Sequence, residues 1–319
     1  MEPLTGTQPR TAPPSSVIET NPDQLFDAAF LAQLESLSLL ARRIVAGKMR
    51  AERRSSRFGS SIEFAEYRPF ISGDDWRHID WNAFARWRQL VLKLFVEEED
   101  LHVHLLLDCS ASMDWGEPAK FDQARRIVAG LAYITLANLD RAAVVPLGAE
   151  RYEPWRPSRG KHRFLQLLRY LALCPVAARK PEPRRLEEAA HRWIASQPRR
   201  GMVIWVSDLW GADPEDALHA LDRLRYARHE LAVIQVIDPA ETDAGERGEY
   251  EVIDEETGAP RKVIVDHQTR TEYRERVEAY QESLRSYCRR HQVALIQTDT
   301  RMAAPDLLMQ SLLQGGFVK

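Results

Sequence analysis

Residues 101–113 read LHVHLLLDCSASM, and this stretch decides the fold class. A short apolar run ends abruptly at Asp108, and Ser110 and Ser112 follow at alternate positions. An apolar run of this length that gives way to small polar residues is typical of a buried strand leading into a loop. The carboxylate and the two hydroxyls would then lie together at the carboxyl end of a strand, where open parallel α/β sheets bind their ligands.

Helical and strand patterns alternate along the chain after this stretch, which predicts a parallel α/β sheet. A second buried strand, near residues 202–206, also ends in polar residues, Ser207 and Asp208. Because the carboxyl ends of parallel strands meet at one edge of a sheet, we expect Asp208 to lie beside Asp108. A strand pattern around residues 151–155, after a glycine turn, predicts an antiparallel edge strand.

Three regions are predicted along the chain. Residues 1–21 are rich in proline, serine and threonine, which is typical of a disordered tail. Residues 22–100 hold an amphipathic helix and then, from 59 to 100, tryptophans interleaved with arginines and aspartates, which predicts a small β-rich or irregular subdomain held by Arg–carboxylate pairs. Residues 101–319 form the α/β domain, with a pattern typical of an inserted hairpin at about residues 249–265.

The bulk composition limits the compartment and the partners. The chain has 319 residues, 44% of them hydrophobic, which supports a sizeable core. A net charge of −3 gives no general basis for binding nucleic acid, and none is expected as a partner. The three cysteines are scattered and lack CxxC spacing, so they suggest neither a disulfide framework nor a thiolate zinc site. Without a signal peptide pattern or a transmembrane segment in the sequence, we expect a cytoplasmic protein.

Asp108, Ser110, Ser112 and Asp208 are the candidate metal ligands. Hard oxygen ligands of low total charge suit Mg²⁺ or Mn²⁺, which keep water molecules that a partner's carboxylate can replace. The two aspartates could equally cap the helices that follow them and bind no ion. The spacing of the residues leaves both interpretations open.

The same residues argue against an enzyme. A phosphoryl hydrolase with Asp108 as its nucleophile usually needs a second carboxylate two residues later, where this chain has Ser110. The sequence contains neither a GxxxxGK[ST] phosphate loop nor a GxSxG elbow. We therefore expect a protein that binds without catalysing a reaction, with a metal-dependent phosphoryl hydrolase using Asp108 as the alternative.

The segment DCSASM, residues 108–113, resembles the DxSxS motif of metal-ion-dependent adhesion sites in von Willebrand factor type A domains. Together with EFAEYRPFISGDDWRHIDWNAFARW, residues 63–87, it is similar to the domain-of-unknown-function 58 family, from about residue 34 to the C-terminus. The resemblance implies a doubly wound, mostly parallel, von Willebrand A-like fold with a metal site at Asp108, Ser110, Ser112 and Asp208. It also implies that the protein acts with a MoxR-type AAA+ ATPase, on an unknown client, in the assembly or maturation of another complex.

One difference from the adhesion-site pattern bears on metal binding. Domains with a complete site also supply a threonine from the loop between the two aspartate-terminated strands, where this chain has Arg184 and Arg185. An arginine beside a dication is electrostatically unfavourable, and it could instead meet a partner's carboxylate directly. A further alternative is that the DxSxS motif is vestigial and the protein is a metal-independent scaffold that binds through residues 59–100.

Overall fold

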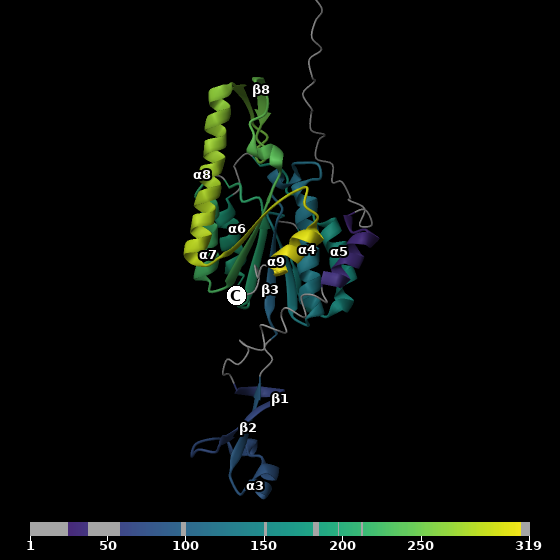
Figure 1. The fold of residues 1–319 in the computed structure, drawn as a ribbon, viewed down its shortest axis with the longest axis vertical. Helices are drawn as coiled ribbons and strands as arrows, with labels where there is room; N and C mark the ends of the chain where they lie inside the picture. Colours follow the sequence, from purple (N-terminus) through teal and green to yellow (C-terminus); the bar gives the residue numbers. More distant parts are fainter. Residues whose placement is uncertain are drawn as a thin grey trace, which may run out of the picture. The chain divides into compact units, whose positions relative to one another are not determined.

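The chain forms two compact units in the computed structural model (Figure 1). The small unit spans Arg43–Leu101, and the large unit combines Met1–Arg42 with His102–Lys319. The predicted disordered tail, residues 1–21, and Arg184 lie outside the described residues. The structure describes residues 25–37, 58–96, 100–149, 152–180, 185–196, 198–211 and 213–313.

The large unit is built on a six-stranded sheet with the order β10-β7-β6-β3-β4-β5. Neighbouring strands run parallel, except that β5 pairs antiparallel with β4 at one edge. The winding starts at β3 and continues in both directions, which is the order of a doubly wound sheet, so the predicted α/β fold is confirmed. The strands are β3 (His102–Asp108), β4 (Arg141–Leu147), β5 (Trp155–Arg159), β6 (Met202–Ser207), β7 (Glu230–Ile237) and β10 (Ala294–Asp299).

Strand β3 lies in the middle of this sheet. Its residues Leu105, Leu106 and Leu107 are all 0% exposed, because helices cover both faces of a parallel sheet and both sides of a strand must then be apolar. Leu107 is in register with Val206 of β6, so the ends of the two strands are level. This register positions the two polar strand endings side by side.

Helices cover the two faces of the sheet as separate layers (Figure 1). The buried side chains of α6, α7 and α8 form one apolar core with β3 and β6, while α4 contacts α5 and α9 in the other layer. None of the described helices is both long and apolar enough to cross a bilayer. The helices are α4 (Lys120–Ala137), α5 (Phe164–Leu173), α6 (Leu186–Ala195), α7 (Asp216–Tyr226), α8 (His267–His291) and α9 (Ala304–Leu313).

The N-terminal helix, residues 28–37, packs on the large unit. Leu34 is 0% exposed, and its side chain lies 3.3 Å from the position that a Cβ atom on Gly130 of α4 would occupy. Arg126 of α4 donates a hydrogen bond from Nε to the carbonyl oxygen of Leu25, at 2.9 Å. The sequence predicted one region containing this helix and residues 59–100, whereas in the structure its apolar face is covered by the α/β unit.

The edge strand lies further along the chain than predicted. We expected it around residues 151–155, but β5 begins at Trp155. Gly148, with φ of 98°, ends β4, and the amide of Tyr152 then donates to the carbonyl of Ala149 at 2.9 Å. An extra turn thus occupies the residues that a tight hairpin would have left for the strand.

The predicted inserted hairpin is present. It consists of β8 (Gly248–Ile253) paired antiparallel with β9 (Pro260–Val265). Its turn is closed by hydrogen bonds from the amides of Thr257 and Gly258 to Asp254, at 2.7 Å each. Gly258 has φ of 72°, in the left-handed region that favours glycine.

The small unit is a hairpin of β1 (Phe58–Pro69) and β2 (Val91–Val96) with helix α3 (Trp81–Trp87) between the strands. Arg68 pairs with Asp74 at 2.7 Å, and the hydroxyl of Tyr67 donates to Asp80 at 2.8 Å. The carboxylate of Asp80 also accepts the first amides of α3. The described residues between 59 and 96 thus form a small β-structure with an Arg–carboxylate pair.

Candidate functional site

The predicted site residues lie at the carboxyl edge of the sheet, between β3 and β6. This is the point at which the winding order of the strands reverses, and ligands of open α/β sheets bind at such points. Asp108 is 2% exposed and Asp208 is 0% exposed. The hydroxyl of Ser207 donates to Oδ2 of Asp108 at 2.5 Å, which joins the two strand endings directly.

The DxSxS segment turns sharply after β3. The amide of Ser110 donates to Oδ1 of Asp108 at 2.9 Å, and the chain continues into a short 3₁₀ helix, η2 (Ala111–Asp114). This turn places Oγ of Ser110 and Oγ of Ser112 3.1 Å apart. Two adjacent oxygen ligands of an octahedral Mg²⁺ ion are about 3 Å apart, because each lies about 2.1 Å from the metal at a right angle. The two hydroxyls therefore have the spacing of neighbouring ligands on one cation.

The chain after β6 is held by a second sharp turn. Leu209 has φ of 60°, an unusual conformation for a residue other than glycine. This conformation lets the amide of Leu209 donate to Oγ of Ser207 at 2.8 Å and the amide of Trp210 donate to Oδ1 of Asp208 at 3.0 Å. Ser207 and Asp208 are thus fixed in orientation by their own backbone.

Neither aspartate caps the helix that follows it. The N-cap residue of α4 is Ala119, which makes no side-chain capping bond, and the amides at the start of α7 are capped by Asp213. Asp108 and Asp208 instead accept the amide two residues later, within loops. The interpretation of the two aspartates as helix caps was therefore wrong.

Lys120 brings a positive charge into the site. Its side chain is 0% exposed, and its ammonium group donates to Oδ2 of Asp208 at 2.7 Å and to Glu241. Burial alone would lower the pKa of Lys120, but the charges of Asp208 and Glu241 hold it above its ordinary value. Asp208 is therefore an ion-paired carboxylate rather than an unpaired one.

Glu241 is positioned by a capping box at the start of the 3₁₀ helix η4 (Pro239–Thr242). The carboxylate of Asp238 accepts the amide of Ala240 at 2.8 Å, and the amide of Asp238 donates to Glu241 at 3.1 Å. The spacing Asp-x-x-Glu is the sequence signal of such a box, although our interpretation of the sequence missed it. Lys120 had no comparable signal, because its partners are 88 and 121 residues away in the chain.

Negative charge exceeds positive charge within this cluster. The described side chains joined here include three carboxyl groups, those of Asp108, Asp208 and Glu241, and one ammonium group, that of Lys120. Burial raises the pKa of Asp108 to about 6, and the charge of Asp208 adds to the effect. A further cation beside Asp108 would relieve this repulsion.

The turn of the β8–β9 hairpin lies against the DxSxS segment. The amide of Ser112 donates to Oε1 of Glu256 at 2.8 Å, and the amide of Lys180 donates to the carbonyl of Glu256 at 2.9 Å. Arg179 pairs with the neighbouring Glu255 at 2.6 Å. A carboxylate from a remote segment of the same chain thus lies beside the two serines, which the sequence pattern did not predict.

Arg185 lies at the position where a complete adhesion site would supply a threonine ligand. Arg185 directly precedes α6 and lies 3.7 Å from Asp213, outside the polar cluster. Over the part of the chain that the structure describes, no three His, Cys, Asp or Glu side chains converge on a point that could hold a metal ion. A cation at Asp108 would therefore depend on the serine hydroxyls and on water molecules for its remaining ligands.

Cys109 points away from this cluster and is 0% exposed, as expected for a small core residue. Its Sγ atom lies 3.8 Å from that of Cys174, and neither cysteine forms a disulfide.

Comparison with known proteins places these residues in a family. The model of the family described as "Protein of unknown function DUF58" matches residues 66–294. "Uncharacterized protein Rv1480" of Mycobacterium tuberculosis is 27% identical over 270 residues, which cover 83% of this chain and 82% of that protein. "Uncharacterized protein MAV169" of Mycobacterium avium is 33% identical over 120 residues, which cover 37% of this chain and 68% of that protein.

Two solved structures are similar at lower levels of identity. The conserved hypothetical protein BatB from Bacteroides thetaiotaomicron has a TM-score of 0.38 and 13% identity, with 67% of this chain and 98% of that chain covered. An aerotolerance-related membrane protein from Bacteroides fragilis has the same TM-score and identity, with 67% of this chain and 99% of that chain covered.

Proposed function

Since the chain belongs to the DUF58 family, we propose that it is a non-enzymatic protein-interaction module that docks an acidic group of a partner at the carboxyl edge of its sheet. In this proposal Asp108, Ser110 and Ser112 hold Mg²⁺ or Mn²⁺, and Asp208 supports them through water. When bound, the cation supplies an open coordination position for a carboxylate. The ion pair of Asp208 with Lys120 suits this supporting role, because it fixes the Asp208 carboxylate next to Asp108.

The observation that carries the proposal is the arrangement of Ser110 and Ser112. Their hydroxyl oxygens are 3.1 Å apart, beside a carboxylate that is 2% exposed. One carboxylate and two hydroxyls form a hard-oxygen ligand set, and such sets favour Mg²⁺ or Mn²⁺ over softer metals. The excess of carboxyl groups around Asp108 further favours a cation there.

The choice of an acidic group on the partner rests on Glu256. Its carboxylate accepts a hydrogen bond from the amide of Ser112 at 2.8 Å, so a carboxylate has room at this edge. A partner's carboxylate would replace that of Glu256 beside the two serines. Without a cation, the carboxylates of the site would repel an acidic partner, and metal binding and docking are therefore coupled.

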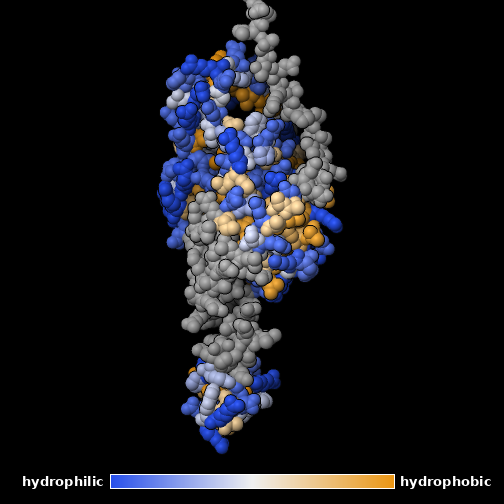
Figure 2. Space-filling model, turned by 45° about the vertical axis from the view of Figure 1, so that its right-hand side comes forward, coloured by the Kyte–Doolittle hydropathy of each residue, from blue (hydrophilic) through white to orange (hydrophobic). Residues whose placement is uncertain are grey.

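The distribution of hydrophobic residues on one face of the large unit agrees with docking through polar groups. On the face shown in Figure 2, the hydrophobic residues of the large unit lie in small areas separated by hydrophilic ones. Stable apolar docking needs a larger continuous hydrophobic patch. We propose a MoxR-type AAA+ ATPase as the partner, acting with this protein on a client during complex assembly or maturation, on the strength of the resemblance described above.

Calorimetric titration with Mg²⁺ and Mn²⁺ tests the metal site. We expect saturable heat with the unchanged protein, loss of that heat with Asp108→Ala, and at least tenfold weaker binding with Ser112→Ala. Asp306→Ala is the matched control, because Asp306 is an exposed aspartate at the start of α9. Equal heats from the unchanged protein and Asp108→Ala would contradict the proposal.

A second candidate function is favoured by the small unit. Trp76, Trp81 and Trp87 are 64%, 59% and 54% exposed, respectively. Tryptophan is enriched at protein interfaces, where its large ring buries much apolar area. The small unit would then act as a metal-independent scaffold, and its binding to a partner would withstand EDTA, unlike docking at Asp108.

A further inference from the structure

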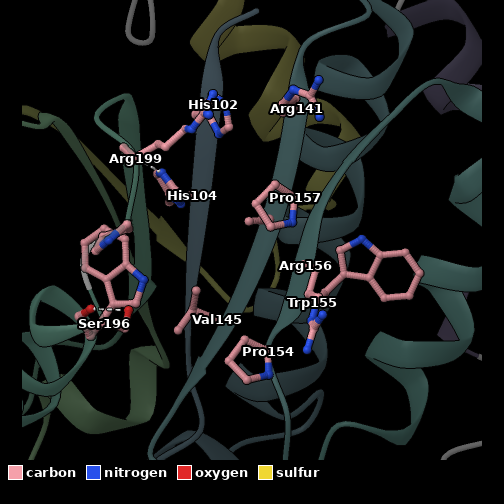
Figure 3. Close-up of a pocket in the computed structure, with 13 residues that line it drawn as sticks. His102, His104, Arg141, Val145, Pro154, Trp155, Arg156, Pro157, Ser196 and Arg199 are labelled. Carbon is pink, nitrogen blue, oxygen red and sulfur yellow. Dashed lines mark hydrogen bonds between the residues drawn. The ribbon is translucent and has the colours of Figure 1, made fainter.

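A pocket of about 490 Å³ opens on the sheet of the large unit beside α6 (Figure 3). Its floor is formed by β3 and β4, and its walls come from α6, from the segment before β6 and from the start of β5. His102, at the opposite end of β3 from Asp108, lines the pocket. Because six residues of a strand span about 20 Å, this pocket is separate from the Asp108 site.

The charges that line the pocket have one sign. Arg141, Arg156 and Arg199 contribute guanidinium groups, and none of the 13 residues that line it is acidic. In Figure 3, Arg199 lies on one side, with His102 and His104, and Arg141 lies on the other. An anion between these walls would therefore be attracted from more than one direction.

The floor and one wall of the pocket are apolar. Val145 of β4 lies between the two charged sides in Figure 3, and Trp193 of α6 forms a wall. Both side chains are less than 10% exposed, at 9% and 7%. A volume of about 490 Å³ lies within the range of small-molecule sites, which are mostly apolar with a few charged groups that set orientation.

The charged wall is held in place by buried aromatic packing. Nε2 of His104 lies 2.8 Å from the carbonyl oxygen of Arg199 and, when it carries the proton, donates to it. The ring of His104 packs against Trp193, with centroids 5.3 Å apart, and against His229, at 5.7 Å. The backbone that carries Arg199 is thus fixed before any ligand binds, which reduces the cost of ordering it.

We propose that this pocket binds a small organic anion with a flat apolar body. The anionic group, a carboxylate or a phosphate, pairs with the guanidinium groups that line the pocket, and the apolar body lies against Trp193 and Val145. This site is independent of the proposed metal site, because none of its lining residues belongs to the Asp108 cluster.

Titration calorimetry of the full chain with three matched probes tests this site. The probes are 2-naphthoate, 2-naphthyl phosphate and the neutral 2-naphthamide, which share one apolar body. We expect at least one anionic probe to bind with a dissociation constant below about 1 mM, which is reasonable for a ligand of this size. The neutral amide should bind at least tenfold more weakly, and the better of the two anions identifies the natural anionic group.

Variants locate the binding. Arg199→Gln and Arg156→Gln should each weaken the better anion roughly tenfold, the effect of losing one charged hydrogen bond. Arg169→Gln, on the exposed side of α5, is the matched control and should leave the affinity unchanged. Because all three arginines are exposed, their substitution should leave the fold intact, and circular dichroism before each titration verifies this. Equal binding of the amide and the anions, no saturable heat at millimolar concentration, or equal effects of all three substitutions would overturn the proposal.

Discussion

Lys120 holds the polar cluster together electrostatically. It is fully buried and is ion-paired with both Asp208 and Glu241. Removing one partner of a buried ion pair leaves the other charge without compensation, which costs about 3–5 kcal/mol. We expect Lys120→Met to lower the free energy of unfolding by about this amount in urea denaturation, although methionine fills a similar volume.

Two further variants show whether the loss comes from charge. Lys262→Met, on an exposed position of β9, should change the free energy of unfolding by less than about 0.5 kcal/mol. Asp208→Asn in the Lys120→Met background should recover part of the loss, because it removes a buried unpaired charge. A Lys120→Met protein as stable as Lys262→Met would show that the ion pair contributes nothing.

His104 gives the large unit a pH-dependent stability. Burial lowers its pKa below the ordinary value of 6.5, and the charges of His229 and His102 lower it further. The native protein therefore keeps His104 neutral while the unfolded chain takes up a proton, so stability is lost as the pH falls below 6.5. The His104→Gln variant can still donate a hydrogen bond to the carbonyl of Arg199. As the pH falls, it should therefore lose less stability than the unchanged protein.

The measurement compares the free energies of unfolding of the two proteins from about pH 7.5 to about pH 5.5. The comparison is needed because protonation of Asp108 changes the free energy of unfolding in the opposite direction to protonation of His104. Its native pKa of about 6 exceeds the ordinary 3.8, so protonating Asp108 stabilises the native state as the pH falls through this window. The difference between the two proteins cancels this contribution, and parallel curves would contradict a role for His104.

Part of the candidate site can be predicted from the sequence. Asp108 ends strand β3, Ser110 and Asp208 come just after strand endings, and the order of a parallel sheet brings such endings together. Lys120 and Glu256 join the cluster through contacts with residues 88 and 144 positions away. No local periodicity encodes contacts of that length, which is why both residues were missed.

A substitution in the N-terminal helix can test whether this helix belongs to the core of the large unit. Leu34 is 0% exposed and packs against α4 beside Gly130. Truncating a buried leucine costs about 2–5 kcal/mol, so Leu34→Ala should lower the free energy of unfolding of the large unit by this amount. Gln33→Ala, one residue earlier on the exposed side, is the control and should have little effect. If the two variants were equally stable, the helix would not belong to the core of this unit.

Individual elements were predicted more accurately than their packing. Apolar residues recur at helical spacing in residues 164–173 and 186–195, where the structure has α5 and α6, because such a pattern records the face that a helix buries. The same kind of pattern at residues 28–37 identified a helix but not the surface that covers it, which α4 supplies through Gly130. β5 was misplaced because a turn of several residues, closed by Tyr152 and Ala149, has no apolar alternation to mark its length.

Under the proposed function, two surfaces of the molecule are candidates for docking a protein partner. The large unit carries the Asp108 cluster, and the small unit carries the exposed tryptophans of α3 and its flanking turn. Because the two surfaces belong to separate compact units, a substitution in one should leave the structure of the other unchanged. Single substitutions can therefore assign partner binding to one unit.

Retention of a MoxR-type AAA+ ATPase from the same organism on the immobilised full chain distinguishes the two surfaces. If the partner docks through a cation at Asp108, EDTA and Asp108→Ala should each reduce retention at least tenfold, which corresponds to about 1.4 kcal/mol. Trp81→Ala should then have no effect, because Trp81 belongs to the small unit and is not part of the Asp108 cluster. The opposite result, loss with Trp81→Ala and full retention in EDTA, would assign docking to the small unit and make the cation irrelevant to it. Adding Mg²⁺ back after EDTA should restore retention for the unchanged protein and for Trp81→Ala, but not for Asp108→Ala, since only that variant lacks the carboxylate that holds the ion.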